Sequence, residues 1–391
     1  MKITDVKTTL ISVPFQRPEV WAWGKRTGIS SVIVEITTDE GLTGIGEIAI
    51  LPSVAVLERI VQEARPLLIG ETPFCVEAFT KRFYGIGGWQ YYRRIANHAL
   101  GGIEMALWDL IGKICNQPLL HLFGGPVRSE IEYMYFLLRD DIETMTAEAK
   151  TAVEKGYRTI YFKVGVDPAK DEAMVKAVRE AVGDDIKLRV DANGVWSVGT
   201  AIRTLKRLEK YDLEFIEQPV AVGDFEGMKQ VKEAVGIPVA ANESSWTAHD
   251  VLEIIKRKAA DIVLIDTHQD GGLLAFKKTA AMAELEGIPV IKHSFGELGI
   301  STCAAAHVIA TSANFLFANQ TFIPFLTDDI IQKGAFHYEG GKLTLIADKP
   351  GIGVSLDKEK MAYYAELYRQ KGELRSTGEI AKGYVPWTPK Y

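Results

Sequence analysis

The chain has 391 residues, of which 47% are hydrophobic and 25% charged, with a formal net charge of −6 at pH 7. These values are typical of a globular protein, and the absence of any basic run or block of like charges argues against nucleic acids and anionic membranes as partners. The three cysteines are scattered without a CxxC pair, and neither a signal peptide nor a stretch of about 18 apolar residues is present. We therefore expect buried free thiols and a cytoplasmic location.

The first 125 residues predict an α+β domain. Residues 2–13 and 30–38 alternate between polar and apolar side chains, as antiparallel strands do. Apolar residues then recur at intervals of three and four over 53–68 and 98–115, which indicates helices. The glycines of HLFGG at 121–125 end this domain.

The second half of the chain contains six apolar runs, each closed by a polar residue. The runs are IYFK to Lys163, LRVD to Asp191, FIE to Glu217, PVAAN to Asn242, IVLID to Asp266 and VIKH to His293. The closing residues follow one another at intervals of 24 to 28 residues, which is the length of one strand, one loop and one helix. With flanking strands expected at 131–136 and 314–318, the pattern predicts a (β/α)8 barrel, an α/β fold, over 126–355. Its helices are expected at 144–155, 169–182, 198–210, 224–235, 247–258 and 273–286.

A third segment, 356–391, follows the barrel. A helix is expected near 358–372, with a polar tail behind it. We expect this segment to pack back on the N-terminal α+β domain and to complete it.

The barrel topology predicts a metal site. Asp191, Glu217 and Asn242 close three consecutive strands, whose ends lie about 4.8 Å apart in a sheet. Two carboxylates and an amide oxygen are hard ligands that favour Mg²⁺. Without a cation, two adjacent buried acids would repel each other. We therefore predict Mg²⁺ as the cofactor.

The remaining strand ends predict acid–base groups. Lys163 and His293 close the second and seventh strands, so that they lie on different sides of the barrel mouth. Asp266 closes the sixth strand, within reach of His293, where its carboxylate would fix the imidazole tautomer. A carboxylate substrate held by the metal would meet a base on either face. His268 is expected to be a loop residue, and a core position is expected for His98, His121, His249, His307 and His337.

Longer stretches resemble the enolase superfamily, in particular its mandelate racemase and glucarate dehydratase branch. They are ALGGIEMALWDLIGK at 99–113, VDANGVWS at 190–197, FIEQP at 215–219 and KPGIGVSLD at 349–357. The resemblance spans nearly the whole chain and implies a capping domain, a catalytic barrel and Mg²⁺-assisted formation of an enediolate. It also implies a homo-oligomer, either a dimer or an octamer.

Two positions depart from the common pattern of this family. The second strand reads Tyr161-Phe162-Lys163 where the family has Lys-x-Lys, so a cationic neighbour of Lys163 is lost. Tyr161 is then expected to hydrogen-bond the substrate carboxylate. The third metal ligand is Asn242, as in glucarate dehydratases, whereas an alignment shifted by one residue would make it Glu243.

Substrate recognition is expected from the capping domain and the strand ends. The loop at 14–29 offers Trp23, Lys25 and Arg26, and the loop at 84–94 offers two adjacent arginines. These cations would suit a distal carboxylate or the hydroxyls of an acid sugar. Asn193 and Asn319 are further candidates for binding a small carboxylate substrate.

Three functions remain open at this point. The first is an acid-sugar dehydratase, in which a base removes the α-proton and His293 then expels the 3-hydroxyl to give a 2-keto-3-deoxy acid. The second is a racemase or epimerase that uses Lys163 and His293 on opposite faces. The third, a binding protein on a barrel scaffold, is disfavoured by the complete set of ligands and bases.

Overall fold

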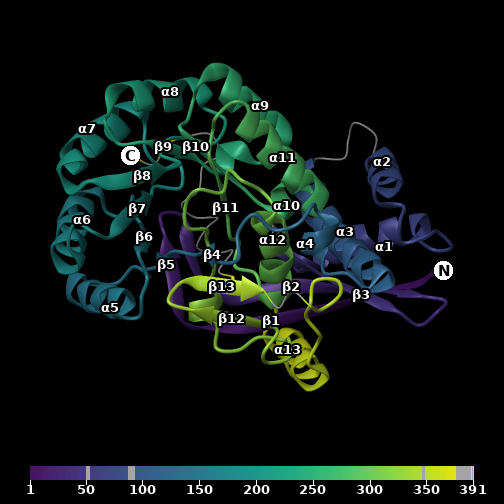
Figure 1. Ribbon diagram of the computed structural model, residues 1–391. Coiled ribbons are helices and arrows are strands. Elements are labelled where there is room, and N and C mark those ends of the chain that lie inside the picture. Colours follow the sequence, from purple (N-terminus) through teal and green to yellow (C-terminus); the bar gives the residue numbers. More distant parts are fainter. Residues whose placement is uncertain (50–52, 87–92, 346–347, 376–388, 390) are drawn as a thin grey trace.

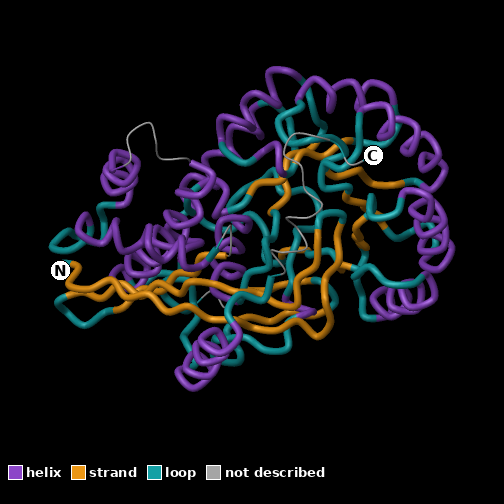
Figure 2. The backbone as a smooth tube through the Cα atoms, turned by 180° about the vertical axis from the view of Figure 1, so that it is seen from behind, coloured by secondary structure: helices purple, strands orange, loops and turns teal. Residues whose placement is uncertain are grey.

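The computed structural model describes residues 1–49, 53–86, 93–345, 348–375, 389 and 391. A long antiparallel sheet with helices beside it makes up the N-terminal domain, and a curled parallel sheet surrounded by helices makes up the barrel (Figure 1). Seen from behind, the helices form an outer layer around the strands of the barrel (Figure 2). The predicted (β/α)8-type barrel with an N-terminal α+β domain is thus confirmed.

The N-terminal domain, called the cap below, is a three-stranded meander with its helices on one face. Alternate residues of β2 pack in different cores: Val32 and Val34 against the cap helices, and Ile33 in the core that continues into the barrel. The sheet is therefore buried on both faces. The elements of the cap are β1 (Ile3–Trp21), β2 (Gly24–Thr38), β3 (Thr43–Ala49), α1 (Val54–Ala64), η1 (Arg65–Leu67), α2 (Val76–Ile86), α3 (Arg93–Cys115) and α4 (Leu119–Leu122).

The barrel strands form a seven-stranded parallel sheet in the order β11-β10-β9-β8-β7-β6-β5. Their bounds are β5 (Tyr135–Phe136), β6 (Thr159–Lys163), β7 (Lys187–Asp191), β8 (Leu213–Glu217), β9 (Val239–Ala241), β10 (Ile262–Ile265) and β11 (Val290–Lys292). Just before them, β4 (Ile131–Glu132) belongs to a separate antiparallel sheet. The predicted first strand at 131–136 is thus two short strands. The parallel strands are two to five residues long.

The predicted eighth strand at 314–318 is not a regular strand, but this segment still closes the barrel. The amide of Val290 donates to the carbonyl of Asn314 (3.1 Å), and that of Met134 donates to the carbonyl of Asn319 (2.9 Å). The side chain of Asn319 adds hydrogen bonds to Lys292 N (2.9 Å) and Glu132 O (3.2 Å). The segment thus joins β11 to β4 through a mixture of backbone and amide contacts.

The barrel helices lie where the sequence predicts them. Several begin at a capping side chain, as Ser197 does for α7 and Thr247 for α9, where Asp250 completes a capping box. Their bounds are α5 (Ile142–Glu154), α6 (Pro168–Val182), α7 (Val198–Leu208), η3 (Glu209–Tyr211), α8 (Phe225–Ala234), η4 (Glu243–Ser245), α9 (Ala248–Arg257), α10 (Thr267–Asp270), α11 (Leu273–Leu285) and α12 (Gly299–Ala310).

The C-terminal segment returns to the cap. Helix α13 (Lys358–Lys371) packs against β1, and Ser12 Oγ donates to the carbonyl of Gly372 (2.9 Å). Most of the polar tail, 376–388 and 390, lies outside the described residues. Before α13, η5 (Ile323–Phe325) is followed by a hairpin, β12 (Phe336–Glu339) and β13 (Lys342–Leu345), that the sequence analysis did not predict and that pairs with β4.

Two buried glutamates of the cap hold the barrel by capping its helices. Glu104 of α3 accepts hydrogen bonds from Leu273 N (2.6 Å) and Leu274 N (3.1 Å) at the start of α11. Glu47 of β3 accepts them from Leu298 N (2.9 Å) and Ser301 N (3.1 Å) at the start of α12. Free N–H groups and a positive dipole end make helix N-termini good partners for a carboxylate. The cap and the barrel are therefore joined through two charge-assisted contacts.

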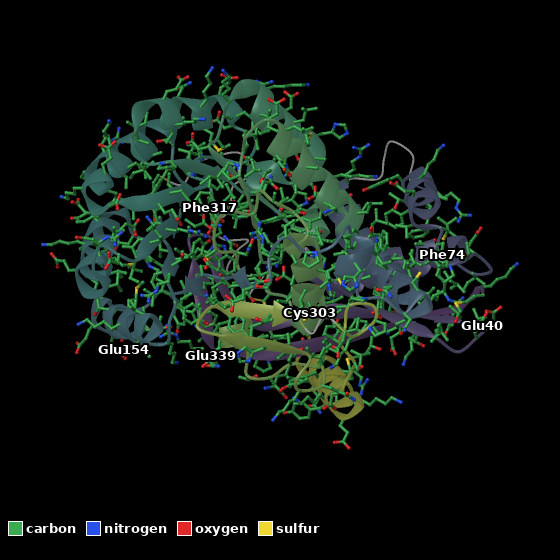
Figure 3. The ribbon with its side chains drawn as sticks, viewed as in Figure 1. Glu40, Phe74, Glu154, Cys303, Phe317 and Glu339 are labelled. Carbon is green, nitrogen blue, oxygen red and sulfur yellow. The ribbon has the colours of Figure 1, made fainter. Side chains whose placement is uncertain are left out.

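The cysteines are free in the structure. Cys75 and Cys303 are buried as expected, whereas Cys115 at the end of α3 is exposed, contrary to the prediction. Cys303 lies in the interior on α12, while Glu40, Glu154 and Glu339 mark the periphery (Figure 3). Among the described residues, no helix combines the length and the apolar character needed to cross a membrane.

Candidate active site at the barrel mouth

The register of the parallel sheet brings three predicted site residues side by side. Lys163 at the end of β6 pairs with Asp191 at the end of β7, and Asp191 pairs with Glu217 at the end of β8. Asn242 directly follows β9, the next strand. We call these residues, together with Glu243, the floor cluster.

Lys163, Tyr161 and Asp191 form a triangle of hydrogen bonds. Lys163 Nζ lies 2.7 Å from Asp191 Oδ2 and 2.9 Å from the Tyr161 hydroxyl, which itself donates to Asp191 Oδ2 at 2.6 Å. Burial would lower the pKa of Lys163, but the charges of Asp191 and Glu217 outweigh it and raise that pKa. Burial, with Asp191 nearby, raises the pKa of Tyr161 well above its usual value. Both groups therefore hold their protons, and the tyrosine that was expected to face the substrate carboxylate here supports a metal-ligand candidate.

Glu217 is fully buried between two amides. Asn242 Nδ2 donates to its Oε1 (2.7 Å), and Gln320 Nε2 donates to its Oε2 (2.9 Å). Burial and then the charge of Asp191 raise the pKa of Glu217 well above its usual value. Within the described part of the chain, both oxygens of Glu217 are thus held by neutral amides and by no directly paired cation.

Asn193 and Glu243 extend the floor cluster on its other side. Asn193 Nδ2 donates to Asp191 Oδ2 (3.0 Å) and to Glu243 Oε1 (2.8 Å), while Glu243 Oε2 is buried without a partner among the described residues. Burial and the Asp191 charge raise the pKa of Glu243 to about 7. Asn193 adopts a left-handed backbone, with φ of 46°, which turns its side chain back over the strand end.

The donor set of the floor cluster fits a hard divalent cation. Three carboxylates meet one ammonium group, and a cation would relieve the repulsion that raises the pKa of Glu217. Turning the Asn242 amide over would place its oxygen 2.7 Å from Glu217 Oε1, near the roughly 2.9 Å between neighbouring ligand oxygens of octahedral Mg²⁺. Gln269 Nε2 faces Asn242 at 3.4 Å and its own Oε1 has no partner in the described chain, so both amides can turn together.

His293 directly follows β11, and its imidazole ring forms no hydrogen bond with the described residues. Its ring packs edge-on against Phe295, with the ring centroids 4.3 Å apart. Its Nδ1 is buried and has no partner among the residues that the structure describes. Burial lowers the pKa of His293 well below its usual value. The ring is therefore a neutral imidazole that can accept a proton.

Asp266 differs from its predicted role. It accepts hydrogen bonds from the backbone amide of His268 (2.7 Å) and shares a contact of 2.9 Å with His268 Nδ1, while Lys292 Nζ lies 3.5 Å from its Oδ2. The expected hydrogen bond to His293 is not formed in the described chain, although Asp266 Oδ2 and His293 Nδ1 are both buried without hydrogen-bond partners. His268 and Lys292 instead contact this carboxylate and balance its charge. Burial would raise the pKa of Asp266, but Lys292 and His268 outweigh it and lower that pKa.

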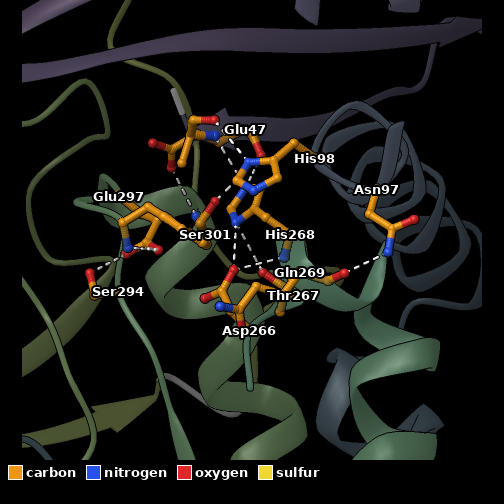
Figure 4. Close-up of polar contacts among 12 residues, drawn as sticks. Glu47, Asn97, His98, Asp266, Thr267, His268, Gln269, Ser294, Glu297 and Ser301 are labelled. Atoms are coloured by element: carbon orange, nitrogen blue, oxygen red, sulfur yellow. Dashed lines mark hydrogen bonds and ion pairs between the residues drawn. The ribbon is translucent and has the colours of Figure 1, made fainter. Parts of the chain in front are cut away.

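Asp266, His268 and Lys292 belong to a second buried network, which we call the interface cluster. It contains Glu47, Asp266, His268, Lys292 and Glu297, and Figure 4 labels all of these except Lys292. His268 Nε2 reaches the carbonyl of Glu47 in the cap at 2.9 Å. Among the described residues, Asp266, His268 and Glu297 have potential metal-ligand atoms within reach of one another. Lys292 Nζ, however, lies 3.0 Å from Glu297 Oε2 and already supplies the positive charge. The interface cluster is thus an internal ion-pair network, and His268 is a buried residue of α10 instead of the expected loop residue. Of the histidines expected in the core, His98 and His307 are buried, whereas the prediction was wrong for His121, His249 and His337, which are exposed.

A cavity of about 400 Å³ lies above the floor cluster and reaches the cap. Among the predicted residues, Lys163, Tyr161, Asn193, Asn242, Glu243, His293 and Arg26 line it. The other lining residues, most of them not predicted, are Glu19, Trp21, Arg94, Ile95, Met134, Phe136, Val222, Trp246, Ser294, Phe295, Gln320, Phe322 and Arg375. The walls thus combine aromatic rings with several cationic groups.

Three residues predicted to bind substrate do not line this cavity. Lys25 is exposed, because it pairs with Val20 in the β1–β2 hairpin while its neighbour Arg26 pairs with Glu19, and successive side chains point to opposite faces. Trp23 Nε1 donates to the carbonyl of Asn193 (2.7 Å) and so fixes the hairpin to the β7 loop. The side chain of Asn319 is engaged by the backbone in closing the barrel.

Comparison with known proteins agrees with this architecture. Residues 3–124 match the model of the mandelate racemase / muconate lactonizing enzyme N-terminal domain, and residues 144–360 match the enolase C-terminal domain-like model. The chain belongs to the mandelate racemase/muconate lactonizing enzyme branch of the enolase superfamily.

Relatives in this branch of the enolase superfamily catalyse more than one reaction. An N-succinyl-L-Arg/Lys racemase from Bacillus cereus is 30% identical over 92% of this chain and 97% of its own length. An arabinonate dehydratase from Saccharolobus solfataricus is 31% identical over 83% of this chain and 88% of its own length. The structure of an enolase from Thermobispora bispora, complexed with magnesium and formate, has a TM-score of 0.91 and 27% identity over 100% of both chains. Membership of the superfamily supports an enzyme and includes both racemisation and dehydration.

Three residues in or beside this enolase-superfamily site were not predicted from the sequence: Lys292, His268 and Arg375. Lys292 stands directly before His293 in VIKH and His268 stands two residues after Asp266, so both were visible as titratable neighbours of predicted residues. Arg375 carried no such signal, because only the return of α13 to the cap carries it to the cavity.

Proposed function

We propose that this protein is a Mg²⁺-dependent acid-sugar dehydratase, which removes the α-proton of a carboxylate and eliminates the 3-hydroxyl to give a 2-keto-3-deoxy acid. The observation that carries the proposal is that Lys163, Asn242, Glu243 and His293 line one cavity. Behind them, Lys163 is hydrogen-bonded to Asp191 and Asn242 to Glu217, and these buried acids together with Glu243 fit a divalent cation. The arabinonate dehydratase relative supports this choice of reaction.

Asp191, Glu217 and Asn242 would hold the metal, with Glu243 as the alternative to Asn242. When bound, the cation would draw negative charge from the substrate carboxylate and make its α-proton more acidic. Lys163, charged and held by Asp191 and Tyr161, would stabilise the negative charge that develops on the substrate. These residues therefore position and polarise, and they leave the proton transfer to another group.

His293 would carry out the proton transfers. Because burial keeps its imidazole neutral, it can accept the α-proton from a substrate in the cavity. The imidazolium that forms would then donate the same proton to the departing hydroxyl as water leaves. One residue thus serves first as base and then as acid, on one face of the substrate.

A racemase or epimerase is the second candidate. The placement of Lys163 and His293 supports it. β6 and β11, which carry Lys163 and His293, are separated by four strands in the order of the sheet. A substrate between them would meet the neutral imidazole on one face and the ammonium group on the other. His293 would remove the α-proton, and Lys163 would return one to the opposite face. The racemase relative and the aromatic walls of the cavity support this reading.

A single experiment separates the two candidates. The protein, stripped with EDTA and reloaded with Mg²⁺, is incubated in deuterated water with a library of aldonic and aldaric acids. A 2-keto product detected with semicarbazide supports the dehydratase, whereas deuterium uptake at the α-carbon without keto product supports the epimerase. Activity that is equal in metal-free and Mg²⁺-loaded protein would contradict both. The predicted homo-oligomer and cytoplasmic location stay predictions.

The role of His293 has its own test. Loss of a general acid–base residue typically costs a factor of about 10²–10⁴ in rate. We expect His293→Asn to lose at least two orders of magnitude in turnover while keeping its Mg²⁺ affinity, measured by calorimetry. Near-normal turnover of the true substrate by this variant would contradict the assignment of His293 as the base, and Lys163 would then have to take that role.

A further inference from the structure

We propose that Arg94 and Arg375 form a second anion-binding subsite in the cavity, so that the substrate carries a distal carboxylate besides the one at the metal. This inference rests on the proposed function, because it takes the first carboxylate to lie at the floor cluster. It narrows the substrate class to dicarboxylic acids of short chain length.

Four cationic side chains line the cavity, and two of them are already neutralised. Lys163 is paired with Asp191 at 2.7 Å. Arg26 forms an ion pair with Glu19, donates to the carbonyl of Phe295 and stacks on the ring of Phe322, with Cζ 4.6 Å from the centroid. Each of these two cations is therefore already balanced by a carboxylate of this chain.

Arg94 is the third cation, and its charge is unbalanced. It lies in the first turn of α3, and its guanidinium stands over the ring of Trp246, with Cζ 5.6 Å from the centroid. No carboxylate or carbonyl in the described ranges lies within hydrogen-bond distance of this guanidinium. The positive end of a 23-residue helix adds to its attraction for an anion.

Arg375 is the fourth cation and comes from the opposite end of the chain. It forms a backbone bridge with Arg26 in the cap hairpin and is half-buried. Its guanidinium has no hydrogen-bond or ion-pair partner in the part of the chain that is described. Burial and the neighbouring Arg26 charge lower the pKa of Arg375, and the charges of Glu373 and Glu19 oppose this shift without reversing it.

An anionic ligand would supply a counter-charge and hydrogen-bond acceptors to the guanidinium groups of Arg94 and Arg375. A partly buried charge without a partner is costly, and guanidinium groups bind carboxylates through short, charge-assisted hydrogen bonds. The cavity of about 400 Å³ suits a small molecule, and its aromatic walls leave little room for a large polar chain. The distribution of charge thus favours a compact substrate with an acidic group at each end.

The test compares matched ligands on the Mg²⁺-loaded protein by calorimetry. The dicarboxylates are malate, 2-hydroxyglutarate and 2-hydroxyadipate, and their partners of equal length are 2-hydroxybutyrate, 2-hydroxyvalerate and 2-hydroxyhexanoate. We expect at least one dicarboxylate to bind 10-fold or more tightly than its partner. Arg94→Met and Arg375→Met should each reduce that ratio, and the double variant should bring it close to one.

Arg93→Met is the matched control, because Arg93 is the exposed neighbour of Arg94 and does not line the cavity. In this variant, the ratio of the affinities for a dicarboxylate and for its partner of equal length should stay at the value of the unmodified protein. Equal binding of the two series, or a preference that survives the double variant, would overturn the subsite while leaving the proposed function intact. If neither series binds although Mg²⁺ itself does, the placement of the first carboxylate fails, and the subsite fails with it.

Discussion

Two buried clusters of acidic residues lie close together in this molecule, and they differ in what completes them. In the floor cluster, Asp191, Glu217 and Glu243 share one ammonium group, and one carboxylate oxygen of Glu243 is left without a partner in the described chain. In the interface cluster, Lys292 lies between Asp266 and Glu297. Only the floor cluster borders the large cavity through most of its members.

The comparison shows that the residue types of a cluster do not reveal its task. The interface cluster holds an Asp, a His and a Glu in metal-ligand arrangement, yet Lys292 lies beside both acids and balances their charge, although one oxygen of Asp266 has no hydrogen bond among the described residues. The floor cluster has three carboxylates and one ammonium group. A site for a cation is thus recognised by its excess of negative charge, and a structural network by charges that are largely balanced.

The largest effect is expected from Glu217→Gln. Removal of a proposed ligand should lower Mg²⁺ affinity by more than the 10–100-fold that loss of an outer partner typically costs, and turnover should fall with it. Because a like charge is removed from beside Asp191, the metal-free variant should unfold at the same or a higher temperature. Calorimetric Mg²⁺ titration and thermal melting measure both quantities. Glu297→Gln serves as the control and should keep the Mg²⁺ affinity.

Lys292→Met tests the interface cluster from the opposite direction. Lys292 is 2% exposed, and its removal would leave Asp266 and Glu297 buried without a counter-charge. Breaking a buried ion pair in this way costs about 3–5 kcal/mol of stability. Urea denaturation should show this loss, while the Mg²⁺ affinity of the folded variant should be unchanged. A variant as stable as the unmodified protein would mean that the interface cluster is not completed by this lysine.

A smaller loss of stability is expected from Glu47→Gln. The glutamine would turn an amide donor toward the backbone N–H of Leu298 or Ser301, which Glu47 now accepts. Leaving a buried donor unsatisfied costs about 1–3 kcal/mol. The melting temperature should fall, with Mg²⁺ binding preserved. If the free energy of Mg²⁺ binding decreased by more than the free energy of unfolding, Glu47 would have to be assigned to the metal site as well as to the interface cluster.

The smallest effect is a dependence of stability on pH. Burial raises the pKa of Asp270 to about 8, and Thr279 Oγ1 donates to it at 2.8 Å. The folded protein therefore binds a proton that the unfolded chain releases near pH 4, so this contribution to stability declines as pH rises toward 8 and is constant above it. Asp270→Asn should remove the dependence. The difference in unfolding free energy between the two proteins should change by about 1 kcal/mol between pH 7 and pH 8, measured by urea titration.

The barrel and the floor cluster follow directly from the sequence pattern. Parallel strands that end in register carry their closing residues to one edge, so regular spacing was enough to bring Lys163, Asp191 and Glu217 together. The segment at 314–318 is not the regular strand that was predicted. The side chain of the next residue, Asn319, makes hydrogen bonds that the backbone would make in a regular strand pair. A periodic pattern indicates which residues face inward. It does not indicate where a side-chain hydrogen bond takes the place of a backbone hydrogen bond.

The partners of the site residues were harder to predict than their positions. Asp266 and His293 close adjacent strands, yet His268 and Lys292 are nearer competitors for the carboxylate. Lys25 and Arg26 look equivalent in the sequence, whereas the hairpin register turns only Arg26 to the cavity. Arg375 is brought in by α13 from beyond the barrel. Each of these outcomes depends on competition between contacts in space.

The two capping glutamates have a consequence for the exchange of parts between relatives. A barrel combined with the cap of another protein would lose Glu47 and Glu104, and the first turns of α11 and α12 would face a foreign surface. At Gly272 an added Cβ would lie 2.5 Å from Glu104 Cδ, so the barrel side is shaped to this carboxylate as well. A functional chimaera would need an acid at both cap positions and a glycine at this barrel position. These three residues, remote from the chemistry, define which caps and barrels of the family are interchangeable with those of this chain.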